Sequence, residues 1–187
     1  MKGFFSNLPK IETNRLILRK FEDTDAEDMY EYSSNENISK YVLWKRHENI
    51  EVSKEFIKYI LSNYSRGELP APWAIVYKEN GKVIGTIEFV EYNIEDKYAE
   101  IGYAISEDYW GQGITVEAAK ELLDIGFNIL DLNRIQARCM IENVQSAKVM
   151  SKMGMIYEGT LRKYNIIKGS FKDIKMYSIL KEEWLNL

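Results

Sequence analysis

The sequence is poor in the two residue types that build most metal centres and covalent active sites. Among 187 residues there is one cysteine and one histidine. The single Cys139 excludes an internal disulfide and a zinc site made of paired cysteines. Nucleophile–histidine triads would have to rely on His47 alone, which disfavours hydrolase chemistry of that kind. We therefore expect no metal, and we predict that His47, between Arg46 and Glu48, lies on a solvent-exposed loop.

Long apolar runs are also missing. No run approaches the ~20 residues that a membrane-spanning helix needs. Residues 1–10 lack the apolar centre of a secretory signal. The three prolines all fall before the midpoint, and no repeat or low-complexity linker divides the 187 residues. We expect a single domain over residues 1–187, no membrane partner and, by default, a cytoplasmic location.

Positive charge is in slight deficit. The formal net charge is −4 and the pI is near 5.3. Such a surface does not attract a phosphate backbone, so nucleic acid is not expected as a partner. A cationic partner is favoured instead, and small amines, polyamines and basic protein termini all qualify.

The spacing of apolar residues predicts a mixed order of strands and helices. The predicted strands are residues 15–19, 73–77, 83–92, 98–105, 134–140, 155–167 and 172–180, and the predicted helices are about 24–33, 50–64, 115–130 and 143–153. Asn80 and Gly81 predict a type I′ hairpin turn, since both tolerate positive φ. Antiparallel hairpins that lead into a strand–helix–strand unit indicate a mixed α/β (α+β) fold, not a doubly wound one.

A glycine-containing loop, Tyr-Trp-Gly-Gln-Gly-Ile-Thr at residues 109–115, separates a predicted strand from a predicted helix. Unpaired amides and the positive end of the helix dipole favour an anion at such a place. Gly111 and Gly113 would let the backbone approach phosphate oxygens without a Cβ. An ordinary tight turn is the alternative. No Gly-x4-Gly-Lys-Ser/Thr motif occurs, and no third glycine follows three residues after Gly113, which disfavours nucleoside triphosphates and dinucleotides.

Several further segments together resemble a known family. They are Ala-Glu-Ile-Gly-Tyr-Ala-Ile at 99–105, the loop and helix start at 109–118, Arg-Ile-Gln-Ala-Arg at 134–138, and Asn143-x-x-Ser146 through Lys-Met-Gly-Met at 152–155. The chain resembles the GNAT acetyltransferases, closest to the branch of the ribosomal-protein N-terminal (alanine/serine) acetyltransferases, from residue 13 to residue 184. The resemblance implies a GNAT-like single domain with a mostly antiparallel central sheet of about seven strands, a splayed parallel pair and flanking helices.

The resemblance also implies acetyl-CoA as the co-substrate. Backbone amides at the start of the helix would hold the pyrophosphate, and unpaired groups beside the splay would bind the pantetheine arm. The implied cofactor-binding residues are Tyr103, Ala104, Ile105, Trp110, Gly111, Gln112, Gly113, Ile114, Thr115, Asn143 and Ser146. Many members have arginine or glutamine where this chain has Trp110, and a small residue where it has Thr115. Both departures keep the amide cradle and leave the adenosine contacts open.

Direct attack of an amine on a thioester needs an acid for the leaving thiolate and no covalent nucleophile. In many relatives a tyrosine supplies this proton, but counting from Asn143 places Met150 at its position. Ser146, one helical turn after Asn143, resembles the serine that replaces the tyrosine in the ribosomal-protein branch. Its alternative role is a helix-start hydroxyl bonded to the backbone. Cys139 is expected to pack in the core.

Three glutamates are candidates for contact with the amine. Glu100 lies on the strand that feeds the cofactor slot, where it could act as base and bind the substrate. Glu88 and Glu91 lie on the neighbouring strand, in a stretch that also looks like polyamine acetyltransferases. Their odd separation turns them to opposite faces, so only one of them, and we select Glu88, can line a cleft with Glu100. For each carboxylate the alternative is the wet face of a strand.

The function predicted from these features is transfer of an acetyl group from acetyl-CoA directly to a primary amine. The acceptor expected from the resemblance is a protein N-terminal amine, such as that of a ribosomal protein. A small-amine or polyamine N-acetyltransferase is the alternative within the enzymes. A non-catalytic acyl-CoA-binding module is the alternative outside them, motivated by Met150. The sequence leaves open the amine, the acyl length and whether the chain forms a homodimer.

Overall fold

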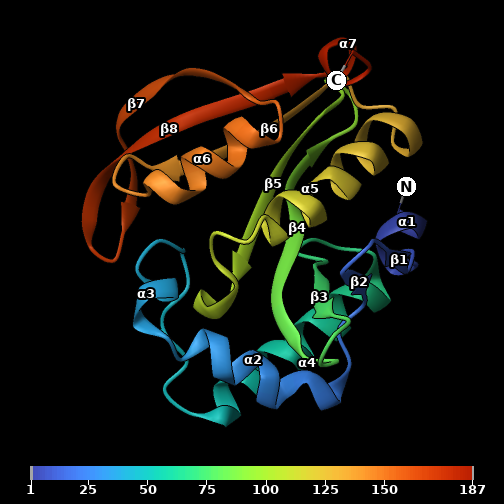
Figure 1. Cartoon of the computed structure of the whole chain (residues 1–187), viewed down its shortest axis with the longest axis vertical. Coiled ribbons are helices and arrows are strands. Elements are labelled where there is room, and N and C mark those ends of the chain that lie inside the picture. The colour runs from blue at the N-terminus through green and yellow to red at the C-terminus, as the bar shows by residue number, and fades with distance from the viewer. Residues whose placement is uncertain (1, 187) are drawn as a thin grey trace. The chain divides into compact units, whose positions relative to one another are not determined.

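The computed structural model describes residues 2–186 (Figure 1). Its first half contains α1 Lys2–Ser6, β1 Ile11–Glu12, β2 Leu16–Arg19, α2 Ala26–Ser33, α3 Glu36–Ser39, α4 Ile50–Arg66, β3 Trp73–Tyr77 and β4 Val83–Asn93. Its second half contains β5 Tyr98–Ile105, α5 Ile114–Asp124, β6 Arg134–Met140, α6 Val144–Lys152, β7 Ile156–Ile167, β8 Ser170–Leu180 and α7 Lys181–Trp184.

The eight strands are hydrogen-bonded in the order β1-β2-β3-β4-β5-β6-β8-β7. β5 and β6 pair in parallel, whereas β1–β2, β2–β3, β3–β4, β6–β8 and β7–β8 are antiparallel. The predicted mixed fold with one parallel pair is therefore confirmed. The strand beyond the predicted seven is β1, whose two residues are too few to show alternation.

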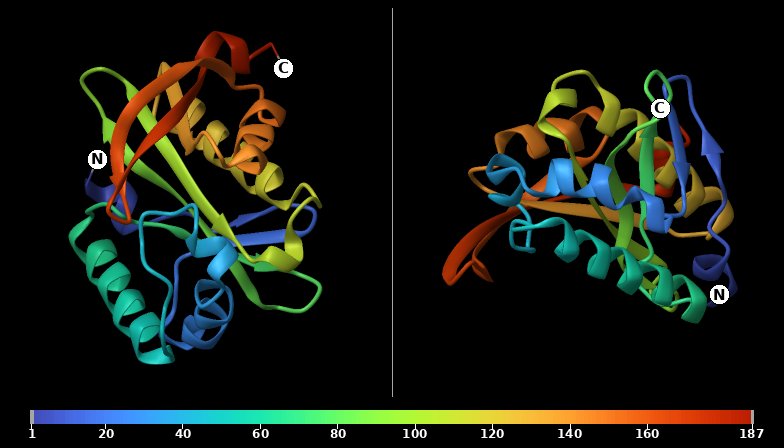
Figure 2. Two further views of the ribbon diagram at one scale, coloured as in Figure 1. Left: turned by 90° about the vertical axis from the view of Figure 1, so that its left-hand side faces the viewer. Right: turned by 90° about the horizontal axis from the view of Figure 1, so that it is seen from below.

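The residue contacts group into two compact units. The first contains the chain up to Phe89 together with Tyr103–Ala118. Here α2 and α4 lie side by side (Figure 2). Met29 of α2 and Ile57 and Ile60 of α4 are almost fully buried, because the apolar residues of each helix recur on one face.

The second unit contains Val90–Gly102 and the chain from Ala119 onward. β6 pairs with β8 from Arg134↔Leu180 to Met140↔Ile174, and β7 folds back on β8. α6 packs against β6 and β7 (Figure 1). Its Met150 is fully buried, so the position at which the family tyrosine would stand belongs to the core of this unit.

Most element bounds agree with the sequence prediction, and one turn does not. Trp73–Tyr77, Tyr98–Ile105 and Arg134–Met140 have the predicted limits. The type I′ turn at Asn80–Gly81 is wrong: Gly81 alone has positive φ, at 73°. The Gly81 amide donates to Tyr77 O at 2.8 Å, and Asn80 Oδ1 accepts from Lys82 N at 3.0 Å, which makes a wider loop.

The expected exposed position of His47 is also wrong. The residue is 6% exposed, and its Nδ1 lies 2.8 Å from Ser53 Oγ. Its ring contacts Trp44 and Phe56, so an aromatic cluster covers it, and burial lowers its pKa. Within residues 2–186 no helix has both the length and the apolar character needed to cross a membrane.

Candidate functional site

The glycine loop in the first unit presents main-chain donors at the start of α5. Gly111 and Gly113 have φ of +75° and +77°, the left-handed region that favours glycine. The backbone bond that opens the helix runs from Glu117 N to Gly113 O, at 3.0 Å. The amides of residues 114–116 precede that bond and have no acceptor within the helix. With no atom within 4 Å of a Cβ built at Gly111, this place suits an anion.

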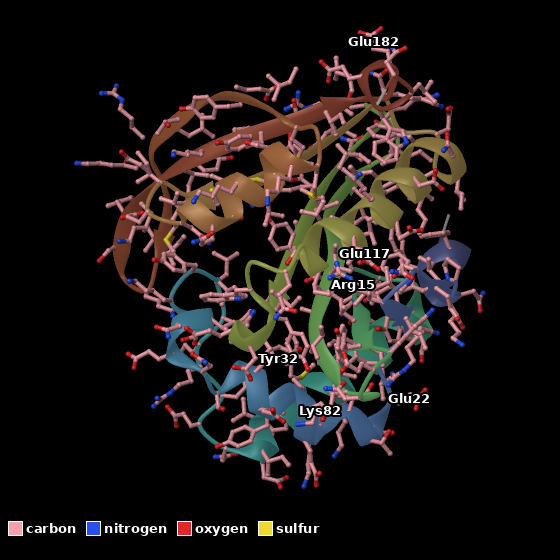
Figure 3. The ribbon with its side chains drawn as sticks, viewed as in Figure 1. Arg15, Glu22, Tyr32, Lys82, Glu117 and Glu182 are labelled. Atoms are coloured by element: carbon pink, nitrogen blue, oxygen red, sulfur yellow. The ribbon has the colours of Figure 1, made fainter. Side chains whose placement is uncertain are left out.

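An ion pair and several hydrogen bonds connect the loop and the first turn of α5 to the turn before β2. We call these contacts the buttress, and its residues Arg15 and Glu117 are labelled in Figure 3. Arg15 Nε lies 2.7 Å from Glu117 Oε2, and Arg15 Nη1 donates to Gln112 O at 2.9 Å. Thr13 Oγ1 donates to Glu117 Oε1 at 2.6 Å. Burial opposes ionisation of Glu117, but these donors prevail and lower its pKa. The carboxylate therefore holds both the first turn of α5 and, through Arg15, the loop carbonyl.

The C-terminal end of β5 lies in the same unit as the loop. It carries Tyr103, Ala104 and Ile105, of which Ala104 and Ile105 are buried. Trp110 Nε1 donates to Ile105 O at 2.9 Å, so the residue that departs from the family pattern fixes the strand end to the loop. On β4, a Cβ at Gly85 would overlap Ala104 O, which requires glycine where the two strands meet.

In the second unit the parallel pair is short. Its register is Tyr98↔Arg134, Ala99↔Ile135 and Glu100↔Gln136. β5 continues beyond Glu100 to residues 101–102 of this unit, and β6 continues to Met140, without further pairing between these described residues. The main-chain groups that face each other there need other partners.

Glu100 is buried and held by two partners in the second unit. Its Oε1 lies 2.7 Å from Arg138 Nε, its Oε2 accepts from Gln136 Nε2 at 3.1 Å, and its side chain is 3% exposed. The wet strand face considered from the sequence is therefore wrong. Burial raises the pKa of Glu100, and Arg138 and Gln136 oppose that rise.

Asn143 and Ser146 meet at the start of α6, also in the second unit. Asn143 Oδ1 accepts from Ser146 N at 3.0 Å and caps the helix, which leaves its Nδ2 group as a donor for a ligand carbonyl. Ser146 hydrogen-bonds the Cys139 thiol, although burial is the larger effect and raises the pKa of that thiol. Cys139 is 7% exposed, which confirms the expected packing role.

Glu88 in the first unit is the candidate whose charge is least compensated. Its Oε2 atom is buried and has no hydrogen-bond partner among the described residues. Burial raises the pKa of Glu88 to about 7. Thr86, on the same face of β4, has a buried Oγ1 in the same condition. The alternative considered from the sequence was an exposed polar strand face, but both of these atoms are buried.

The candidates thus divide between the two units. Glu88, the end of β5 and the glycine loop belong to the first, and Glu100, Asn143 and Ser146 belong to the second. Sequence reasoning missed Thr86 and the buttress residues Arg15 and Glu117. Arg15 and Glu117 are 102 positions apart, so no local pattern joins them. Thr86 had one local signal, its spacing of two residues from Glu88 on a strand.

Residues 15–156 match the family profile described as "Acetyltransferase (GNAT) domain". The uncharacterized N-acetyltransferase p20 of Bacillus licheniformis is 36% identical over 172 residues, which are 92% of this chain and 96% of that protein. The spermidine N(1)-acetyltransferase of Vibrio cholerae is 27% identical over 174 residues, which are 92% of this chain and 97% of that protein. The matched region includes the glycine loop and the strands on both sides of it.

Solved structures are similar over most of the chain. An acetyltransferase (GNAT family) from Bacillus anthracis has a TM-score of 0.81 at 30% identity, covering 93% of this chain and 99% of that one. The microcin C7 self immunity acetyltransferase MccE, in complex with acetyl-CoA and AMP, has a TM-score of 0.80 at 25% identity, covering 90% and 93%. The ribosomal-protein-S5-alanine acetyltransferase from Vibrio fischeri has a TM-score of 0.79 at 24% identity, covering 94% and 98%, and shows the shared fold.

Proposed function

Since the chain belongs to the GNAT family of acetyl-CoA-dependent N-acetyltransferases, we propose that it acetylates the N-terminal amine of a protein, such as a ribosomal protein. The motifs at residues 99–118 and 134–155 support this choice of acceptor, because they resemble the branch that acts on such termini. A protein N-terminus and a polyamine such as spermidine both present a primary amine as the acceptor.

The glycine loop is the observation that carries the proposal. The amides of residues 114–116 lie in the first turn of α5. Gly111 leaves space in front of them, and the Arg15–Glu117 ion pair holds the loop in place. These features fit a diphosphate, because main-chain N–H groups and the helix dipole both favour negative charge. Residues 110–115 would then hold the pyrophosphate of acetyl-CoA, which supplies the activated acetyl thioester.

We assign the rest of the cofactor site to the residues beside the parted strands. Tyr103, Ala104 and Ile105 would flank the pantetheine arm, and Asn143 Nδ2 would donate to it. Ser146 would give its hydroxyl proton to the departing thiolate, and its hydrogen bond with Cys139 keeps the hydroxyl oriented. Arg138 and Gln136 both stabilise the Glu100 carboxylate and make it a weaker base, so its proposed role in the site is to position Arg138.

A polyamine acceptor is the second candidate, because a specific surface feature favours it. A cavity of about 210 Å³ in the first unit is lined by Asp28, Glu31 and Asp108 among others, and carboxylates attract a polycation. Glu31 is partly neutralised by Lys82, at 2.7 Å. The spermidine acetyltransferase of Vibrio cholerae is similar over nearly its whole length.

The test measures CoA release by the purified protein with three acceptors at equal concentration. These are a peptide with an N-terminal alanine or serine, the same peptide with its terminus blocked, and spermidine. We expect release with the free peptide only. Release with spermidine alone would favour the polyamine enzyme. Micromolar binding of acetyl-CoA without release on any amine would indicate a binding module.

A further inference from the structure

Two buried oxygen atoms on one face of β4 have no hydrogen-bond partner within residues 2–186. They are Thr86 Oγ1 and Glu88 Oε2. Buried polar atoms are almost always hydrogen-bonded, so two exceptions on the same face need an explanation. Residues two apart on a strand have Cα atoms about 7 Å apart, so one small polar group between the side chains can reach both. The observation points to a ligand atom that both oxygens accept from.

The surroundings of these atoms are apolar and phenolic. Tyr32 of α2 is 3% exposed and Tyr64 of α4 is 3% exposed. Burial raises the pKa of each phenol, and the charge of Glu88 raises both further, so the carboxylate lies within electrostatic reach of both rings. The Tyr64 hydroxyl already donates to Pro72 O and accepts from Phe21 N. It therefore has no proton left for Glu88.

The other charged groups around these phenols have partners of their own. Lys20, whose ammonium lies 4.7 Å from the centroid of the Tyr64 ring, donates to Ser6 O at 2.7 Å. Arg19 of β2 donates to both oxygens of Asp25, at 2.7 and 2.8 Å. Asp28 of α2 accepts from Val83 N at 2.7 Å. As whole residues Thr86 and Glu88 are partly exposed, although the Thr86 Oγ1 and Glu88 Oε2 atoms themselves are buried. A cationic ligand that arrives there meets one uncompensated carboxylate.

We propose that Thr86 and Glu88 bind the primary ammonium of the acceptor, and that Glu88 removes its proton. An ammonium group carries three N–H donors and no acceptor, which matches two acceptor oxygens that lack donors. β4 is adjacent to β5, whose end carries Tyr103–Ile105, so this pair lies one strand from the residues assigned to the pantetheine arm. The inference rests on the proposed function.

The proton balance of the step is simple. The Glu88 carboxylate takes one proton from R–NH₃⁺, and the freed nitrogen lone pair attacks the thioester carbonyl carbon. The C–S bond breaks, the sulfur leaves with the electron pair, and the second nitrogen proton ends on that sulfur, so the products are the amide and the free thiol. Glu88 then releases its proton to solvent. A carboxyl whose pKa is raised to about 7 can hold and release a proton near neutral pH.

Glu100 is less suited to this step, since its carboxylate is stabilised by the Arg138 guanidinium and by Gln136. A carboxylate in an ion pair is a weaker proton acceptor than one with no partner. The difference between the two glutamates is therefore one of partners, because the Glu88 Oε2 atom is buried, as the Glu100 side chain is.

The test compares Glu88→Gln with the wild-type protein on whichever amine the wild type acetylates. We expect kcat to fall ~100-fold or more, the scale of a lost general base, with an unchanged Kd for acetyl-CoA. The rise of kcat with pH through about 7 should disappear in the variant. Thr86→Val should raise KM for the amine and leave that pH profile in place. Glu88→Asp, which keeps a carboxylate, should recover part of the lost rate.

Glu91→Gln is the matched control, because it makes the same change on the same strand at an exposed carboxylate that accepts from Tyr98 OH. It should retain wild-type kcat. A Glu88→Gln protein with wild-type kcat and pH profile would overturn the inference and leave the acetyltransferase intact. Loss of acetyl-CoA binding in Glu88→Gln would assign the carboxylate to the fold and would also overturn it. Absence of wild-type turnover with every amine would instead reject the proposed function.

Discussion

Single residues in this protein owe their roles to partners that are distant in sequence. Glu88 and Glu100 are both acidic residues on strands, yet Glu100 has Arg138 at 2.7 Å and the Glu88 Oε2 atom has no partner among the described residues. His47 differs, because near neighbours in the sequence, Ser53 and the rings of Trp44 and Phe56, bury it although the residues beside it are charged. Sequence reasoning nominated both glutamates without their partners, and it wrongly predicted an exposed His47.

Arg15 gives a prediction at this scale. Its guanidinium bonds Glu117 and the Gln112 carbonyl, so Arg15→Gln should loosen the loop. Charge-assisted hydrogen bonds contribute about 1.5–3 kcal/mol, which corresponds to a roughly 10-fold or larger rise in Kd for acetyl-CoA. Isothermal titration calorimetry with acetyl-CoA measures this change in Kd. Arg15→Lys keeps the charge but not the planar fork, so it should also bind weakly.

Lys10→Gln is the control for Arg15→Gln, because Lys10 forms an exposed ion pair with Glu12 at 2.8 Å. Exposed pairs contribute little, so its Kd should stay at the wild-type value. A folded Arg15→Gln protein with wild-type affinity would show that the loop holds its shape without the buttress.

At the scale of elements, regular patterns gave reliable predictions and short or irregular elements did not. The limits of β3 and β5 follow from their strand-like apolar pattern, and those of β6 follow from its alternation of polar and apolar residues. The four or five residues of α1, α3 and α7 are too short for a helical period to be read. The loop before α5 was predicted because its two glycines and its position between a strand and a helix both favour anion binding.

Gly111 gives a prediction for that loop. Gly111→Asp should abolish acetyl-CoA binding, because a carboxylate would occupy the space in front of the α5 amides. Asparagine is nearly the same size as aspartate, tolerates positive φ and carries no charge. Gly111→Asn should therefore retain part of the affinity for acetyl-CoA. Measuring the acetyl-CoA affinity of both variants by calorimetry separates the effect of the added charge from that of backbone strain.

Gly81 supplies the matched control for Gly111. Its φ is +73°, and no atom lies within 4 Å of a Cβ built there, as at Gly111. Gly81→Asp should therefore suffer the same backbone strain in a different loop and bind acetyl-CoA normally. Equal affinities of Gly111→Asp and Gly81→Asp would remove the loop from the cofactor site.

For the whole molecule, the sequence predicted the class of fold and the order of its main elements. That success has a physical reason, since backbone geometry sets the period at which buried residues recur along a helix or a strand. The contacts that join residues from distant segments, such as Arg15 with Glu117, depend on the completed fold. Thr86 was not nominated because its spacing of two residues from Glu88 places both on one strand face but does not show that its hydroxyl is buried.

The pH dependence of unfolding gives a prediction at this scale. Glu88 has a folded pKa of about 7 against an ordinary value of 4.5, so the folded state binds this proton more tightly. Its contribution to stability is complete below about 4.5 and is lost as the pH rises through 7. Once ionised, it costs the folded state roughly 3 kcal/mol. Thermal melts should show Glu88→Gln above wild type at pH 8 and close to it at pH 4.5.

Glu91→Gln should have the wild-type melting temperature at both pH values, because it makes the same change at an exposed position of β4. An equal offset between Glu88→Gln and wild type across the range would mean that Glu88 does not change its charge there.

The parting of β5 and β6 has a consequence for molecular recognition. Strand edges normally invite other chains to add to a sheet, and proteins keep them covered or short. Here an edge-like stretch follows Glu100 and Gln136 in the middle of the strand order, flanked on the β6 side by β8 and closed at one end by three paired residues. A full polypeptide strand finds no room to extend past that closed end. In the proposed function the pantetheine arm occupies this stretch, and its few amides would pair there with main-chain groups before any side chain takes part.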